Sequence, residues 1–592
     1  MRSSQKPTTR ALVRSSRLPL VFSTLSIAGI LAYSLAQAID GIDLQIESVE
    51  GSGWRAQDVD ATLELSAREP SARVRVGRFE LPQFPQPLRD VSIVCAALDL
   101  SDTEIVCRDA RVDANVPTLG RQTLLGSLRY ERASGALDLN LEGLKAIAKN
   151  VEVTARLRDE RWQVAGTLSH ASLETLMKLA QQVNVPLPLE LVSASGSTSV
   201  RIEATGVGAD VSRLRAKGAI DALTANNESG SLASEALGAS FEVVLSRAAD
   251  AWSYEASFQS DRGQAYAEPI FLDFGVHPFD ATARGQLTDA GQLIVDAFRV
   301  KHAGVMNAEG HAALHLGETI ELTDANLTVH EVEFPGAYDS YVQPLLLETS
   351  VRSLQTSGRI SGAIAIEAGE PRTIDLIFHE LDVEGQQPAI AMRGLKGEWH
   401  WDADDAALES RAIQPSELTW SSGAVYGLDL GASQLRFLSA GRSFQLLAPT
   451  RIPLFDGALQ IDALSVQRAG SENVGFSVDA TIHPISVSRL CRAFGWPEFG
   501  GQLSGSLSNL QFDEGILRLG TTLEAHVFDG LVTVSDLRLD DPFGKWPRLH
   551  ANIDLDRLDL ELLTSAFSFG RITGRLSGGI HGLELFNWTP IA

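Results

Sequence analysis

The sequence lacks the short motifs that mark the common enzyme classes. It contains no G-x-S-x-G nucleophile elbow, no G-x-x-x-x-G-K-[ST] phosphate loop and no G-x-G-x-x-G dinucleotide loop. His330-Glu331 and His379-Glu380 each begin like a zinc motif, but the second histidine four residues later is missing. The sequence therefore predicts a protein that is not an enzyme and has no catalytic, cofactor-binding or metal site.

Basic residues are also scarce. The chain has 50 Lys and Arg against 75 Asp and Glu. Residues 1–39 hold five of the basic residues and no acid, so residues 40–592 carry 45 basic and 75 acidic groups. Such a surface repels phosphate backbones, which excludes nucleic acid as an expected partner. It is equally unsuited to lying flat on anionic lipid head groups.

Long apolar runs are absent after residue 38. The one such run, Leu18–Ala38, contains no charge and follows the basic tail 1–17. Its length suits a membrane-crossing helix, which needs about 20 residues. Ala36-Gln37-Ala38 alternatively reads as a signal-peptide cleavage site. In both cases the tail 1–17 is predicted to be cytoplasmic and the chain from residue 39 to be exported.

Only three cysteines are present. Cys95 and Cys107 lie in two alternating stretches, and a hairpin centred on Ser101 would place them directly opposite each other, within disulfide range. The alternative is that Cys95 and Cys107 are two buried free thiols without a disulfide. Cys491 lies on the apolar side of a predicted helix, which indicates core packing.

What the sequence has in abundance is alternation of apolar and polar residues, as in "ALDLNLEG" and "ANIDLDRLDLEL". Period-two alternation is typical of antiparallel strands with one apolar and one polar face. Helical patterns are few and short, among them "SLETLMKLAQQ", for which Ser172 is a suitable N-cap. The fold class predicted is mainly β, a long repetitive antiparallel sheet with a few short amphipathic helices.

A unit of 73 residues repeats near the end of the chain. "FDGALQIDALSV" begins at Phe455 and "FDGLVTVSDLRL" at Phe528, while "GQLSG" begins at Gly501 and "GRLSG" at Gly574. Looser copies occur upstream, including "GRISGAI" at Gly358. We therefore predict repeat units at 455–527 and 528–592, preceded by looser repeat regions at 171–335 and 336–454 and a first β segment at 39–170.

Both Phe-Asp-Gly strands break their alternation at the same place, where two residues instead of one separate the second and third apolar positions. This pattern predicts a β-bulge, which bends a sheet. The glycines kept in register indicate further bends or close backbone approach, or else room for a helix to pack on the strand. The apolar positions predicted to line a trough, or alternatively a closed core, are Leu459, Ile461, Leu464, Val466, Val532, Val534, Leu537 and Leu539.

The N-terminal anchor, the paired cysteines in "VSIVCAAL" and "EIVCRDA", and the ending "FSFGRITGRLSGGIHGLELFNWTPIA" resemble the YdbH-like branch of the AsmA-like, TamB-related proteins. The resemblance implies an inner-membrane protein of Gram-negative bacteria, held by residues 18–38, with its bulk in the periplasm. It implies a sheet coiled into a U-shaped groove, or β-taco, that carries phospholipids between the inner and outer membranes by their acyl chains.

In such proteins more sheet follows the Gly/Ser strand, so we expect residues 1–592 to be the first part of a longer chain. We further expect a periplasmic or outer-membrane protein partner at the C-terminal end. The alternative function is structural, as an assembly factor for outer-membrane proteins that uses sheet edges. An adhesin or extracellular enzyme built on a β-solenoid would show a short rung repeat, and the 73-residue period does not fit that fold.

Overall fold

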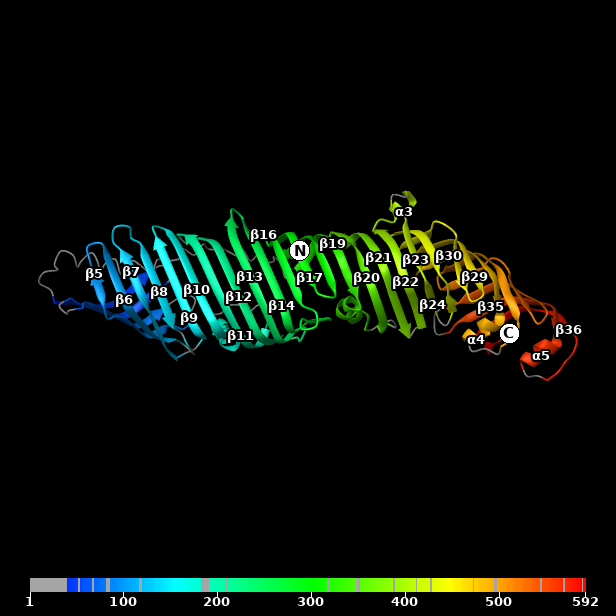
Figure 1. The fold of residues 1–592 in the computed structure, drawn as a ribbon, viewed down its shortest axis with the longest axis horizontal. Helices are drawn as coiled ribbons and strands as arrows, with labels where there is room; N and C mark the ends of the chain where they lie inside the picture. Colours follow the sequence, from blue (N-terminus) through cyan, green and yellow to red (C-terminus); the bar gives the residue numbers. More distant parts are fainter. Residues whose placement is uncertain are drawn as a thin grey trace, which may run out of the picture. The chain divides into compact units, whose positions relative to one another are not determined.

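The computed structural model in Figure 1 describes residues 40–591, apart from gaps at 52–53, 66–68, 81–85, 117–119, 144, 146, 183–190, 209, 317–319, 348, 350–351, 387–388, 411–412, 426–427, 472, 495–497, 543–545, 568–569 and 588. The predicted tail 1–17 and the predicted anchor or signal peptide 18–38 lie outside the described residues. Within them, no helix has the length and apolar character needed to cross a membrane.

The structure is mainly β, with 74% strand and 7% helix, as the alternation predicted. It divides into two compact units, Met1–Ala290 and Gly291–Ala592. Most strands pair antiparallel with the next strand in the chain, and where a strand is short, as at β5, β15 and β32, its neighbour also pairs with the strand after it. A short parallel contact occurs where Trp401 and Asp402 meet Ser439 and Ala440. The fold class is thus confirmed as a repetitive antiparallel sheet with few short helices.

Unit 1 contains strands β1 to β16 and helix α2, and Figure 1 shows β7–β14 side by side. Their bounds are β1 Gly41–Gly51, β2 Trp54–Glu64, β3 Ser71–Glu80, β4 Leu88–Cys95, β5 Leu98–Leu100, β6 Glu104–Val116, β7 Gly120–Glu131, β8 Leu137–Gly143, β9 Ala148–Arg158, β10 Arg161–Ser172, α2 Leu173–Gln182, β11 Leu191–Val207, β12 Asp210–Asn227, β13 Leu232–Ala248, β14 Ala251–Ala267, β15 Ile270–Asp273 and β16 Phe279–Thr288.

In its described residues, unit 2 contains strands β17 to β37 and five short helical segments. Their bounds are β17 Gln292–His302, β18 Met306–Leu316, β19 Ile320–Phe334, η2 Tyr338–Val342, η3 Gln343–Leu346, β20 Leu354–Glu367, β21 Glu370–Gln386, β22 Ala389–Asp402, α3 Ala406–Ser410, β23 Ser416–Trp420, β24 Ser422–Val425, β25 Leu428–Leu430, β26 Ser433–Ala440, β27 Ser443–Leu446, β28 Thr450–Leu454, β29 Gly457–Gln467, β30 Gly475–Ser486, α4 Val487–Phe494, β31 Gly501–Asp513, β32 Ile516–Leu519, β33 Leu523–Val527, β34 Gly530–Asp540, β35 Arg548–Asp559, α5 Leu560–Ala566, β36 Arg575–Phe586 and β37 Thr589–Pro590.

The 73-residue repeat is confirmed element by element. Strands β29 and β30 and helix α4 begin 73 residues before β34, β35 and α5, and β31 ends 73 residues before β36. The register also extends upstream of the Phe-Asp-Gly marker, because β27 and β28 precede β32 and β33 by the same interval. The predicted bulges are confirmed too, since the pairing slips between Ile461 and Ala463 and between Ser535 and Arg538.

Bulges occur at adjacent positions in neighbouring strands, so that they form rows across the sheet. In unit 1 a positive φ occurs in five consecutive strands, at His170, Gly196, Ala222, Ala236 and Gly263. The strand pairings slip beside these residues, so the irregularities are adjacent rather than scattered. Because a bulge bends its strand, such a row bends several strands together.

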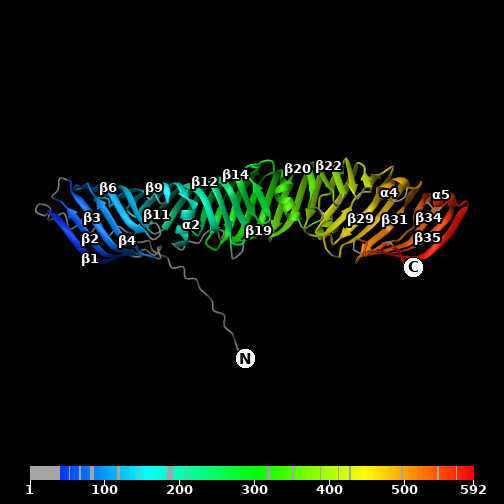
Figure 2. The same ribbon diagram turned by 90° about the horizontal axis from the view of Figure 1, so that it is seen from below.

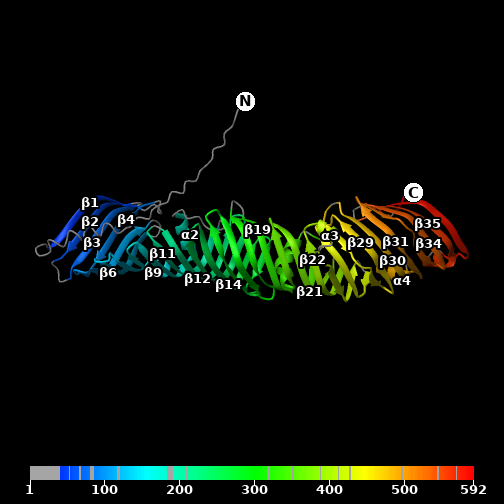
Figure 3. The same ribbon diagram turned by 90° about the horizontal axis from the view of Figure 1, so that it is seen from above.

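The helices lie where hairpin connections are long. Helix α2 contacts β10 and β11 in unit 1, and Figure 2 shows it beside β11. The Ser172 hydroxyl accepts from the Thr175 N–H at 3.3 Å, as its predicted role as N-cap requires. Figure 3 shows α4 beside β30 and β31 in unit 2. Pro344 lies in the first turn of η3. Helix α5 begins after Asp559, whose carboxylate accepts from two backbone N–H groups.

Candidate functional site

The two faces of the sheet in unit 2 differ completely in chemistry. Directly opposed residues of antiparallel strands share a face, so the pairings trace each face from strand to strand. One row runs through Ile452, Leu459, Ile482, Gly505, Leu523, Val534, Ile553 and Ile580. A second runs through Phe444, Val466, Phe476, Phe512, Leu517, Leu539, Leu549 and Leu585. Both rows are apolar throughout.

These rows bring the predicted site residues onto one face. Leu459 and Val534 belong to the first row, and Val466 and Leu539 to the second. Ile461, Leu464 and Leu537 lie between the rows, with the bulge shifting the alternation by one residue, and Val532 lies two residues before Val534, opposite Leu555. All eight side chains are half-buried. The residues between them are polar, and Gln460 Nε2 donates to the Asp462 carboxylate at 2.7 Å on the other face. The assignment of faces from the sequence agrees with the pairings.

The same apolar face continues through the rest of unit 2. A further row runs through Phe298, Gly310, Leu327, Ile364, Ile374 and Trp401. Among the paired residues of the described strands β17–β36, this face carries no Asp, Glu, Lys or Arg. Excluding charge from so many positions indicates a surface kept for apolar contact.

Unit 1 has an equivalent face. One row crosses thirteen strand pairings, through Ile42, Leu63, Ala72, Cys95, Ala110, Gly126, Leu141, Val153, Gly166, Ile202, Ala216, Val243, Ala256 and Ala283. In the described strands of this unit, the paired residues of the face include one charged side chain, Arg247. Its guanidinium lies 5.5 Å from the Trp252 ring centroid and forms an ion pair with Asp289 at 2.6 Å.

This apolar face is not a closed core along its full length. Large apolar side chains are buried only in places, such as Leu438, Phe437 and Leu558. By contrast, Leu44, Ile46, Ile202 and Ile580 on this face are 39–47% exposed. A sheet that buried its apolar face within the chain would cover such residues first. Much of this face is therefore open to solvent in the chain by itself.

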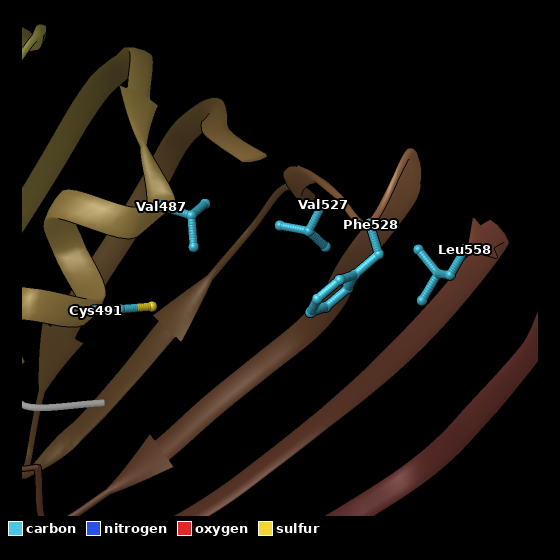
Figure 4. Packing of buried hydrophobic residues seen from close by; sticks show 5 residues of the cluster. All are labelled: Val487, Cys491, Val527, Phe528 and Leu558. Carbon is cyan, nitrogen blue, oxygen red and sulfur yellow. The ribbon is translucent and has the colours of Figure 1, made fainter. Parts of the chain in front are cut away.

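Short helices cover patches of the face. Figure 4 shows Val487 and Cys491 of α4 pointing toward Val527, Phe528 and Leu558, and these five residues form a buried cluster. Cys491 is fully buried there, in agreement with its predicted packing role. In unit 1, Leu176 of α2 packs against Ala148, Val151 and Ala171. The covered stretches are local, so they leave the face between them accessible.

A disulfide joins Cys95 and Cys107 on the apolar face of unit 1, with Cα atoms 5.9 Å apart. The hairpin predicted to be centred on Ser101 is wrong. Cys95 pairs with Ala110 and Cys107 with Leu98, so the two cysteines are diagonal neighbours rather than opposed residues. The strands break between Cys95 and Leu98, and opposite this break the pairing with β7 slips. The bond therefore spans a bend.

The described residues contain no group of three or more His, Cys, Asp or Glu side chains arranged to hold a metal ion. No family model, curated protein or solved structure matches this chain. The site is therefore defined by its own geometry: an apolar, partly open sheet face in each unit, backed by a polar face.

Proposed function

We propose that this chain is a non-enzymatic carrier that moves phospholipids along the apolar face of its sheet, as the resemblance to AsmA-like, TamB-related proteins implies. The observation that carries the proposal is the unbroken apolar face, which lacks Asp, Glu, Lys and Arg among the paired residues described in unit 2 and stays partly exposed. A monomeric soluble protein rarely exposes so much contiguous apolar surface without a ligand or partner to cover it.

The physical basis is the cost of hydrating an acyl chain. Each exposed CH₂ costs about 0.8 kcal/mol in water, so a continuous apolar surface lowers the free energy of the lipid at every point along it. The rows of bulges support a curved sheet, which we propose forms a U-shaped groove with the apolar face inside. The polar head group would remain at the wet rim. Movement along such a groove needs positioning and a gradient rather than bond chemistry.

Residues 18–38 are proposed to hold the chain in the inner membrane, with the sheet in the periplasm between the two membranes of a Gram-negative cell. The disulfide between Cys95 and Cys107 supports an oxidising compartment, since such bonds are rare in reducing cytosol. We also propose that a protein of the periplasm or outer membrane binds at the C-terminal end of this chain.

Site-specific photo-crosslinking tests the carrier function. A photoreactive amino acid at Ile461 or Val534 is expected to form lipid adducts in cells, because both side chains are on the apolar face. Gln460 and Thr533 are matched controls, one residue away on the opposite face. Mass spectrometry of the purified full chain then identifies the lipid. Absence of adducts at Ile461 and Val534, or equal labelling at all four positions, would reject the proposal.

A second candidate is an assembly factor for outer-membrane proteins, favoured by one observation. In the described residues β36 pairs with β35 along one edge, whereas its other edge pairs with β37 only at Leu585 and Phe586. An unpaired strand edge is a template for another strand. Crosslinks from Ser577 to an outer-membrane protein, without lipid adducts on the apolar face, would favour this function over lipid transfer.

A further inference from the structure

Arg247, near the end of strand β13, is the one charged side chain among the paired residues described on the apolar face of unit 1. It stands directly across from Trp252 in β14, and Trp252 stands across from Leu287 in β16. The Arg247 guanidinium lies 5.5 Å from the Trp252 ring centroid. Two residues inward on the same face, Leu245 stands across from Tyr254, so the face is uncharged again. Arg247 therefore marks the point where the apolar face meets the rim of the sheet.

Arg247 is held by a carboxylate from beyond the neighbouring strand. Its Nη1 and Nη2 donate to Oδ1 and Oδ2 of Asp289 at 2.8 and 2.6 Å, so the guanidinium reaches across β14 to the residue that follows β16. The Arg247 side chain is 31% exposed, whereas Arg215 and Arg359, which form ion pairs on the polar face, are 45% and 61% exposed. Arg247 is therefore more deeply placed than these two arginines.

Three aspartates lie around this arginine, and we call them the rim carboxylates. Asp210 begins β12, Asp250 lies in the turn between β13 and β14, and Asp289 follows β16, so neighbouring strands contribute them at one rim. The pKa of Arg247 is raised, first by the hydrogen bond to Asp289 and further by the charges of Asp250 and Asp210. The hydrogen bond from Arg247 lowers the pKa of Asp289, so this carboxylate is ionised at neutral pH. One guanidinium and three carboxylates therefore meet beside an indole ring.

The chemistry of this cluster matches the two charges of a zwitterionic phospholipid head group. A guanidinium binds phosphate oxygens through paired hydrogen bonds, and an aromatic ring beside carboxylates binds an ammonium group. Asp289 is 57% exposed, and an exposed ion pair is weak because water solvates both of its charges. A phosphate can therefore displace Asp289 from Arg247 at little cost, which frees this carboxylate for an ammonium group.

We propose that Arg247, Trp252 and Asp289 bind the head group of a phospholipid that carries both a phosphate and an ammonium group, while its acyl chain lies on the apolar face beside Leu245. The inference rests on the proposed carrier function and names the lipid class that unit 1 prefers. Arg247 binds the phosphate, and the rim carboxylates bind the ammonium group. A phospholipid without an ammonium group, such as phosphatidylglycerol, gains only the first contact and is repelled by the carboxylates.

The test identifies the lipid at the cluster itself. A photoreactive amino acid replaces Leu245 in the full chain, which is purified in detergent and given equal amounts of phosphatidylethanolamine and phosphatidylglycerol with identical acyl chains. Mass spectrometry of the adducts gives the ratio of the two lipids. We expect phosphatidylethanolamine to exceed phosphatidylglycerol about fivefold, the factor that one exposed ion pair supplies. The same reporter at Val534, where the paired residues described on the apolar face of unit 2 carry no charge, should label the two lipids equally.

Two variants separate the two contacts. Asp289→Asn removes a carboxylate and leaves the guanidinium, so the preference at residue 245 should be largely lost while the total labelling persists. Arg247→Gln removes the phosphate contact, so labelling by both lipids at residue 245 should fall about fivefold relative to the same variant labelled at Val534. Arg247→Lys keeps the charge and should restore part of the labelling. Arg215→Gln is the matched control, because it breaks an ion pair with Glu242 on the polar face and should change neither quantity.

A soluble competitor distinguishes the lipid from a free head group. Glycerophosphoethanolamine carries the phosphate and the ammonium group without acyl chains, and in excess it should leave the labelling at residue 245 unchanged. Loss of labelling would show that the cluster binds the free head group by itself, which would overturn its assignment to a lipid.

The remaining outcomes separate this site from the carrier function. Circular dichroism and thermal melting first establish that each variant is folded. If Asp289→Asn and Arg247→Gln give the lipid ratio and yield of the unmodified chain, the head-group site is rejected and the ion pair only ties β13 to the end of β16. Equal labelling by the two lipids at residue 245 of the unmodified chain also rejects it. If the reporter at Val534 forms adducts and the one at residue 245 does not, the head-group site alone fails. If neither forms adducts, the carrier function fails as well.

Discussion

At the scale of single residues, the Gly/Ser phrase that recurs in the sequence is explained by backbone geometry. Gly358 and Gly501 have φ values of 117° and 137°, which side-chain-bearing residues rarely adopt. An added Cβ would lie 2.2 Å from the Glu380 carbonyl oxygen and 2.5 Å from that of His526. Close backbone approach is thus the reason for glycine at both positions. Gly574 also has a positive φ, of 138°, but the nearest atom to an added Cβ is Leu560 Cδ1 of α5 at 3.5 Å, an ordinary contact, so the backbone conformation alone favours glycine there.

Gly501→Ala is therefore expected to destabilise the pairing of β31 with β33 by roughly 1–3 kcal/mol, the cost of backbone strain at one position. Gly500→Ala is the matched control, because no atom lies within 4 Å of an added Cβ there and φ is not in the strained region. Hydrogen exchange measured on peptides from 501–513 gives the local stability. Equal protection in the two variants would contradict the explanation.

A buried carboxylate on the polar face of unit 1 gives a pH-dependent prediction. The Arg111 guanidinium donates to Asp113 at 2.8 Å, and Thr123 also donates to it, which lowers the pKa of Asp113 to about 2. A pKa lowered in the folded state stabilises the fold above the ordinary carboxyl pKa, and this contribution is lost as the pH falls toward 2.

Asp113→Asn should therefore destabilise unit 1 at pH 7, and the difference from the unmodified chain should shrink between pH 4 and pH 2. Urea unfolding at a series of pH values, monitored by hydrogen exchange in 104–131, measures it. Asp99→Asn is a control, since that side chain is 59% exposed and its nearest guanidinium nitrogen is 3.6 Å away. A pH-independent difference would show that the Arg111 contact is not responsible.

At the scale of elements, the bulges are held by a repeated hydrogen bond. The Asn509 N–H donates to Asp479 Oδ1 at 2.7 Å, and 73 residues later the Gly582 N–H donates to Asn552 Oδ1 at 2.8 Å. Both donors have a positive φ, of 58° and 71°. The His170 N–H donates to the Ser199 hydroxyl in the same way in unit 1. At a bulge, one backbone N–H loses its carbonyl partner on the next strand. A side-chain oxygen of that strand accepts the hydrogen bond instead.

The hairpin around the disulfide gives the prediction at this scale. Replacing Cys95 and Cys107 with alanine together should lower the stability of the β4–β6 region by about 3 kcal/mol, as expected for opening a short cross-linked loop. Denaturant unfolding of the double variant, compared with the unmodified chain under oxidising and reducing conditions, measures this loss. Reduction should destabilise the unmodified chain and leave the variant unchanged. Equal sensitivity of the two proteins to reductant would contradict it.

How far the sequence predicts these elements depends on local pattern. The alternation and the repeated Phe-Asp-Gly marker identify the strands, the bulge and the apolar side of β29 and β34. The extension of the repeat to β27 and β28 was missed, because those short strands share no marker residues with β32 and β33. The register of Cys95 was missed although the alternation breaks there, with Ala96 and Ala97 between Cys95 and Leu98, because both alanines are themselves apolar and hide the break.

At the scale of the whole molecule, continuity of the apolar face is a property that no short stretch of sequence contains. Each strand shows its own apolar side, but the row through Ile202, Ala216 and Val243 depends on two hairpin registers and the bulges within them. A slip of one residue in any register would turn a strand's charged side onto this face. The division of the chain after Ala290 is similarly absent from the sequence pattern.

This dependence on continuity leads to a prediction for the carrier function. A single charge on the face should interrupt it, because a buried charge beside an acyl chain loses its hydration without gaining a partner. Val243 and Val244 are neighbours in β13 on opposite faces: Val243 pairs with Ala216 and Ala256, whereas Val244 pairs with Arg215 and Glu255. The two positions allow the same substitution to be compared one residue apart.

Val243→Glu should reduce the lipid that co-purifies with the full chain by about half, since lipid would be excluded from the stretch around the new charge, whereas Val244→Glu should leave it unchanged. Circular dichroism and melting temperature must first show that both proteins are folded. Raising the salt concentration from 0.1 to 1 M should release little lipid from the unmodified chain, because apolar contact is not screened by ions. Lipid that is lost at high salt, or lost equally in the two variants, would mean that charge on the polar face, and not the apolar face, holds it.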